Sequence, residues 1–220
     1  MKDGKTGDKI RKLQELACLL ERRIGEAGKL CRYDGESSLP YRYREENILA
    51  AAELSEKLTG KLRELAAGCV MDPKRLLDYR ERLPEIHQIC VRYQNGILEI
   101  RLPVLLPHRK GAYTEFLDKP LACALQKWSS LRREKGEPVP AFQQAAICFV
   151  HGYLDATTVR DHDNIEAKHI QDVLALFFLQ GDDGMHLDLY HTSELAGKNQ
   201  TVLYLMEREK FPEWVLKRRW

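Results

Sequence analysis

The chain has 220 residues, a formal net charge of +2 and an apolar fraction of 44%. This length and composition fit a soluble folded protein and exclude a disordered chain. No apolar run is long enough to span a bilayer, and residues 1–12 are charged, without an apolar segment behind them. We therefore expect a cytoplasmic protein without membrane contact.

The six cysteines form neither a CxxC motif nor a Cys/His ligand spacing. They fall at apolar positions of the expected helices and strands. This pattern predicts reduced, buried thiols rather than a zinc site.

The first third of the chain carries two apolar repeats with a period of seven residues, which is typical of packed helices. The first repeat consists of Ile10, Ala17, Ile24 and Cys31, with Leu13, Leu20 and Ala27 between them. The second repeat consists of Ile48, Ser55, Leu62 and Cys69, with Ala51, Leu58 and Leu65 between them.

A stretch rich in Gly, Ser and Pro, residues 33–40, separates the two repeats, so we expect an antiparallel helical hairpin. A short third helix should begin at Asp72 and Pro73, where Asp can cap and Pro suits the first turn. Residues 1–84 form this helical arm. Its narrow stripes could also close against a second chain.

Residues 85–220 are predicted to form an α+β domain, because the apolar period changes to two at Ile89, Val91 and Tyr93. Asn95 and Gly96 then favour a tight hairpin turn. The expected order is β-β-α-β-α-β-β, a mixed sheet with two helices on one face. The expected strands cover residues 89–93, 97–105, 145–154, 186–192 and 201–207, and the helices cover residues 119–134 and 165–179. Thr157 and Thr158 are expected to continue the extended backbone of the third strand.

Four acidic residues flank the second of these helices. Asp161 and Asp163 are two residues apart just after a strand, so their carboxylates can converge on one side of an extended chain. Asp182 and Asp183 precede the next strand, which could pair beside the first and bring all four acids together. Such a cluster would need a cation, and oxygen ligands without thiols suit Mg²⁺ or Mn²⁺. The sequence therefore predicts a divalent-metal site for phosphodiester hydrolysis.

Structural explanations are also open for the same residues. Asp163 or Asn164 could cap the helix, and the segment from Asp182 to Gly184 could be an ordinary turn. Lys168 and Asp172 lie four residues apart and could form a surface salt bridge.

Basic clusters are candidates for DNA contact, although such clusters are more often simply solvated surface. The residues we consider are His108, Arg109, Lys110, Arg132 and Arg133, with a further basic run at residues 217–219.

The order of these pieces, from Ile89 to about Glu209, resembles the RusA-like family of Holliday junction resolvases. The shared pattern is a DxDN motif at Asp161, then Lys168, an Asp four residues later, an apolar helix, and the pair Asp182 and Asp183. One extra residue lies between Asn164 and Lys168 compared with the family pattern, which turns a helical side chain by about 100°.

The resemblance implies a homodimer that resolves branched DNA with a metal held by Asp161, Asp163 and Asp183, with Asp182 beside them. It also implies that Lys168 is the catalytic lysine. The helical arm is foreign to the minimal fold of that family, so we interpret residues 1–84 as an added dimerisation or partner-binding arm. The function expected from the sequence is thus a Mg²⁺-dependent endonuclease acting on four-way or branched DNA. The alternatives are a non-catalytic DNA-binding or scaffold protein on the same fold, and a helical adaptor that the second domain only stabilises.

Overall fold

The computed structural model describes residues 2–30, 38–107, 109 and 117–218, and the side chains of residues 6–30 and 42 onward within those ranges. The chain divides into two compact units, and the division falls between Leu77 and Asp78. Among the described residues, no helix is long and apolar enough to cross a membrane.

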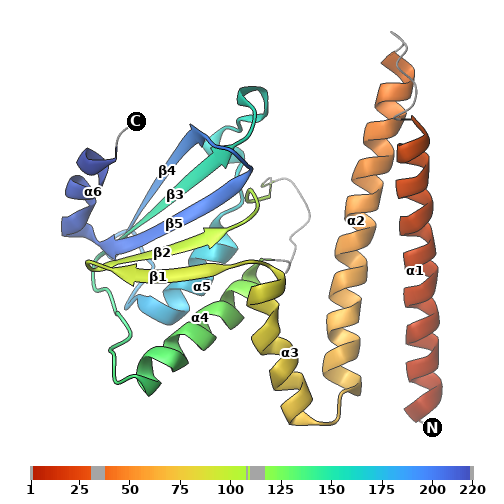
Figure 1. Ribbon diagram of the computed structural model, residues 1–220, viewed down its shortest axis with the longest axis horizontal. Coiled ribbons are helices and arrows are strands. Elements are labelled where there is room, and N and C mark those ends of the chain that lie inside the picture. Colours follow the sequence, from red (N-terminus) through yellow and green to blue (C-terminus); the bar gives the residue numbers. More distant parts are fainter. Residues whose placement is uncertain (1, 31–37, 108, 110–116, 219–220) are drawn as a thin grey trace. The chain divides into compact units, whose positions relative to one another are not determined.

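The first unit contains two long helices, α1 (Lys2–Leu30) and α2 (Ser38–Cys69), which lie side by side and run in opposite directions (Figure 1). Leu13 and Ala27 of α1 and Ala51 of α2 are buried between them. The Arg23 guanidinium donates a hydrogen bond of 2.9 Å to the Asn47 side-chain oxygen and fixes the level at which the helices meet. The antiparallel hairpin agrees with the seven-residue repeats.

Helix α3 (Pro73–Ile86) begins in the first unit and ends in the second. Asp72 accepts a hydrogen bond from the Lys74 backbone N–H, as expected for a residue that caps a helix. Leu83 and Pro84 are buried, and Glu85 forms an ion pair of 2.9 Å with Lys127 of α4 (Asp118–Glu134). The last turns of α3 therefore belong to the second unit, and the division lies seven residues earlier than the expected boundary at residue 84.

The second unit is built on a five-stranded sheet with the strand order β1-β2-β5-β3-β4. Only β3 and β4 are parallel, and the other neighbours are antiparallel. The strands are β1 (Cys90–Gln94), β2 (Ile97–Leu102), β3 (Ala145–Tyr153), β4 (Leu187–Leu195) and β5 (Gln200–Glu207). The helices are α4 (Asp118–Glu134), α5 (Lys168–Phe178) and α6 (Phe211–Lys217).

The two faces of the sheet are covered differently, because side chains alternate along a strand. Helices α4 and α5 lie along one face (Figure 1), where Ile147 and Phe149 of β3 are fully buried. On the other face, Cys148 is fully buried in a cluster, and Tyr204 of β5 and Trp214 of α6 pack against that cluster. Both faces of β3 are thus covered, which explains its continuous apolar sequence.

The α+β class and the order of strands and helices are confirmed, with two local differences. Residues Ala156–Thr158 form a short 3-10 turn instead of extending β3, because Asp155 caps it by accepting a hydrogen bond from the Thr157 backbone N–H. Helix α6 was not expected. Its Phe211 and Trp214 cover an apolar strip on the sheet that would otherwise face water.

The described cysteines are all free thiols, but they are not all buried. Cys148 is buried, and burial raises the pKa of its thiol to about 12, so it stays protonated and unreactive. Cys18 and Cys69 are exposed on the hairpin, which contradicts the expectation of buried thiols there. Cys31 lies outside the described residues.

Packing of α5 on the sheet can be tested with a pair of leucines. Leu174 is fully buried, whereas Leu176, two residues later, is 82% exposed. We expect Leu174→Ala to lower the free energy of unfolding by about 2–5 kcal/mol, because it leaves a cavity in the core. The matched Leu176→Ala should change it by less than about 0.5 kcal/mol in urea denaturation. Equal effects of the two variants would contradict this packing.

Candidate active site at the ends of strands β3 and β4

Asp161 and Asp163 lie on the connection between β3 and α5, at the end of β3. Asp161 immediately precedes the short 3-10 turn His162–Asn164, which contains Asp163, and both side chains are exposed. This turn is held to the segment after β2: Asn164 accepts a hydrogen bond of 2.7 Å from the Arg109 backbone N–H. The structure therefore keeps this acidic pair on one fixed turn, open to solvent.

An open hollow of about 430 Å³ lies beside this turn. It is lined by Thr157, Thr158, Val159, Arg160, Asp161 and Asn164. The Arg160 guanidinium donates a hydrogen bond of 2.6 Å to the Leu106 carbonyl, so this cation is fixed at the rim. The hollow thus combines a carboxylate, an amide, hydroxyls and one cation, a mixture suited to a phosphate with its counter-ion.

Three histidines gather next to the turn. His151 of β3 and His191 of β4 are joined by a hydrogen bond of 3.2 Å between Nε2 and Nδ1. His162, from the acidic turn, has its ring centre 5.9 Å from that of His151 and 5.8 Å from that of His191. Its Nε2 lies 3.0 Å from the Ser193 hydroxyl of β4. We did not predict this histidine group from the sequence, although His151 stands out there as a histidine in an otherwise apolar strand.

The two histidines on the strands are neutral near physiological pH. Burial, followed by repulsion from the neighbouring imidazoles, lowers the pKa of His151 to about 4. Burial and the nearby His162 lower the pKa of His191 to about 4 as well. His151 is fully buried, and its Nδ1 has no hydrogen-bond partner among the described residues. Neutral imidazoles here would not repel a cation bound at Asp161.

Asp182 and Asp183 lie at the other end of β4. The Asp183 carbonyl accepts a hydrogen bond from the Leu187 backbone N–H, and Leu187 pairs with Ala145 at the start of β3. The Asp183 carboxylate accepts hydrogen bonds from the His186 ring, at 2.9 Å, and from the Met185 backbone N–H, and these lower its pKa. This carboxylate is therefore engaged in its own turn.

The expected convergence of all four acids does not occur in this fold. His162 reaches Ser193, which is six residues further along β4 than Leu187, and six residues of a strand cover about 20 Å. Among the described residues, no group of three or more His, Cys, Asp and Glu side chains is arranged to hold a metal ion. The physical reason is that parallel strands start at the same edge, so Asp183 enters β4 where β3 begins, and Asp161 follows where β3 ends.

Lys168 begins α5, and its Nζ lies 3.2 Å from the Asp172 carboxylate oxygen in an exposed ion pair. The surface salt bridge considered as an alternative is thus present. A pair this exposed is worth at most about 1 kcal/mol, so it would not prevent Lys168 from turning to a substrate. The catalytic role of Lys168 remains a prediction.

The basic residues proposed to contact DNA differ in their surroundings. Arg109 is exposed and lies beside the acidic turn through its bond to Asn164. Arg132 is largely covered, because it pairs with Glu137 at 2.9 Å and lies over the Tyr93 and Trp128 rings. Arg133 is exposed on α4. His108 and Lys110 lie outside the described residues.

A family model described as a family of unknown function (DUF6100) matches residues 7–219. The matched span includes both the helical hairpin and the α+β unit. A comparison with curated proteins finds no match.

The histidine group predicts how stability depends on pH. The pKa of His151 is about 4 in the folded chain and about 6.5 in the unfolded chain, so the unfolded chain takes up the proton first as pH falls. The stabilising contribution is complete above about pH 6.5 and should fall by about 3 kcal/mol towards pH 4. Urea denaturation at several pH values would measure this slope, and His151→Leu should make it shallower without abolishing it, because the pKa of His191 is also lowered to about 4. A wild-type chain equally stable at pH 7 and pH 4.5 would contradict the burial of a neutral His151.

Proposed function

The chain belongs to the DUF6100 family, and we propose that it is a Mg²⁺-dependent endonuclease that cuts four-way or branched DNA. In this proposal the metal is held by Asp161 and Asp163. The observation that carries the proposal is the exposed pair of carboxylates on one fixed turn at the end of β3, beside an open hollow. The RusA-like order of motifs in the sequence supports the same reaction class.

Two carboxylates are enough for the metal that this reaction needs. Mg²⁺ usually keeps several waters and binds one or two protein carboxylates together with phosphate oxygens of the substrate. Asp161 and Asp163 match that requirement without Asp182 and Asp183. When bound there, the ion would neutralise the scissile phosphate and lower the pKa of a bound water.

The chain's own residues around the turn support a phosphate-bearing substrate. The backbone of Arg109 is bonded to Asn164, and the Arg160 guanidinium is held at the rim of the hollow, so two cationic residues lie near the turn that carries the carboxylates. His162 is exposed on the same turn, where its imidazole could accept a proton from water. A homodimer, with one site for each of two strands of a junction, and a cytoplasmic location complete the proposal.

A cleavage assay tests this assignment. We expect the chain to nick a labelled synthetic four-way junction only when Mg²⁺ is present, and to leave a linear duplex of the same sequence intact. Asp161→Asn and Asp163→Asn should each lower the rate by roughly 10²–10³-fold, since the charge stabilisation by a metal is worth several kcal/mol. Junction binding should persist, because each change removes a negative charge facing phosphate.

The matched control is Asp182→Asn, which changes an exposed acid at the far end of β4 and should alter the rate by less than about threefold. A loss as large as that of Asp163→Asn would instead favour a four-acid centre. Cleavage by Asp163→Asn at a rate close to that of the wild type would contradict the metal assignment.

A non-catalytic scaffold on the same fold is the second candidate function. The observation favouring it is the separation of the two acidic pairs along β4. In that case the junction would be bound in a salt-dependent manner, without cleavage at any Mg²⁺ concentration.

A further inference from the structure

Only half of each seven-residue apolar repeat faces the interior of the hairpin formed by α1 and α2. Leu13 and Ala27 of α1 and Ala51 of α2 are buried between the helices. The other half of each repeat faces outward: Ile24 is 58% exposed and Ile48 is 51% exposed. Ile10 and Leu62 are exposed to 43% and 48%, and Ala17, Ser55 and Cys69 are exposed as well.

The two outward lines lie on the same side of the hairpin. In each helix the outward residue precedes a buried one by three positions, as in Ile10 and Leu13, or Ile48 and Ala51. Two antiparallel helices are related by an approximate two-fold axis perpendicular to the plane that contains both helix axes. Rotation about this axis exchanges the two helices, but it does not move a residue from one side of that plane to the other. Equal offsets therefore turn both lines to one face, which we call the outer apolar face.

The outer apolar face is organised in three layers. The hydrogen bond between Arg23 and Asn47 sets the level of the helices. From that level and the antiparallel direction of the helices we infer that Ile24 lies beside Ile48, that Ala17 lies beside Ser55 one heptad further, and that Ile10 lies beside Leu62 after one more heptad. The side chains of the three layers are large, small and large, so their order is the same from either end of the hairpin. A two-fold axis between two copies would therefore bring like layers together in either direction along the helices, and an isologous interface places the same patch of both subunits in contact.

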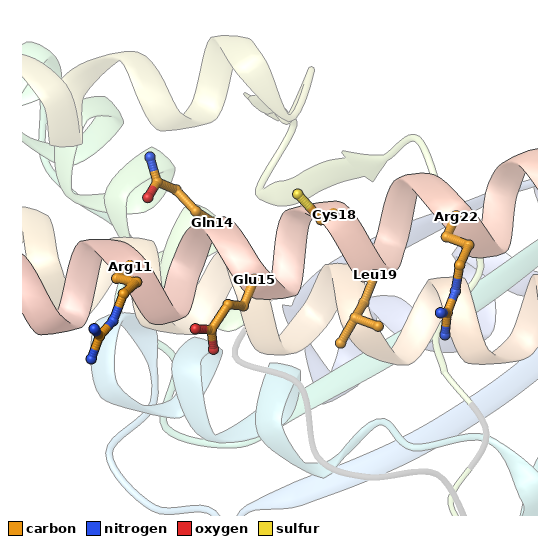
Figure 2. A pocket seen from close by; sticks show the side chains of 6 residues that line it. All are labelled: Arg11, Gln14, Glu15, Cys18, Leu19 and Arg22. Atoms are coloured by element: carbon orange, nitrogen blue, oxygen red, sulfur yellow. The ribbon is translucent and has the colours of Figure 1, made fainter.

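The outer apolar face also differs in charge from the rest of the hairpin. None of its residues is charged. By contrast, the hollow on the adjoining surface of α1 is lined by Arg11, Gln14, Glu15, Cys18, Leu19 and Arg22, half of which are charged (Figure 2). Those charged side chains suit water, whereas the uncharged layers suit another apolar helix surface.

The size of the face fits a stable dimer. Helix α1 has 29 residues, so the hairpin is about 43 Å long, and two packed helices are about 20 Å wide. One whole side of the hairpin thus covers roughly 860 Å² in projection, so a standard interface of about 800 Å² per partner would occupy most of the side that carries the outer apolar face.

We propose that the outer apolar face binds the same face of a second copy of this chain, so that two hairpins form a four-helix bundle. The occupant is a second copy because the layers match themselves in size and order, and because the seven-residue repeat is supplied by the chain itself. This interface lies on the hairpin and is independent of any metal chemistry in the other unit.

Sedimentation velocity of the full-length chain over a range of concentrations tests the proposal. We expect a dimer for the wild type, and a dissociation constant at least about 100-fold weaker for Ile48→Glu, because each interface would then bury two unpaired carboxylates. Leu62→Glu, two layers away, should behave in the same way. The matched control is Leu49→Glu, since Leu49 is 65% exposed and turned about 100° further around α2; it should leave the dimer intact.

Circular dichroism of each variant shows whether the helices persist, which separates dissociation from unfolding. A monomeric wild type, or a dimer that survives both Ile48→Glu and Leu62→Glu, would overturn the proposal. In the second case, a surface other than the outer apolar face would hold the dimer together. Junction cleavage should be measured on the same samples, so that loss of the dimer can be distinguished from a lack of nuclease activity.

Discussion

The parallel pairing of β3 with β4 is the constraint on which the second unit depends. Parallel neighbours cannot be joined by a tight turn, so the chain must cross from the end of β3 back to the start of β4, and α5 makes that crossing. The crossing places Asp161 and Asp163 at one end of the strand pair and Asp183 at the other. It also covers one face of the sheet with α5, which buries Ile147 and Phe149.

The same pairing gathers residues that are distant in the sequence. His151 and His191 lie on neighbouring strands and on the same face, and the turn that carries Asp161 lays His162 beside them. The carboxylates stay exposed while the strand imidazoles are held neutral by burial. A candidate site therefore forms where the strands end, with charged groups at the surface and neutral groups beneath them.

Much of the fold could be predicted from sequence because it depends on local periodicity. The seven-residue repeats indicated the hairpin, and the Asn95-Gly96 turn and the alternation from Ile89 indicated β1 and β2. The relative direction of β3 and β4 depends on contacts between distant segments, so it could not be predicted from local periodicity. Without that direction, we expected Asp161 and Asp183 to lie close together. Helix α6 was missed for a similar reason, because Trp214 contacts residues far away in the chain.

The position of a bound metal can be followed by nuclear magnetic resonance as Mn²⁺ is added to the isotope-labelled chain, and it shows which of the two acidic pairs holds the ion. We expect the backbone signals of residues 161–164 to broaden first, while those of residues 182–184, about 20 Å away along β4, broaden only at much higher Mn²⁺. Simultaneous broadening of both segments at the same low Mn²⁺ concentration would contradict the separation of the acidic pairs. Absence of broadening at residues 161–164 would contradict the metal site itself.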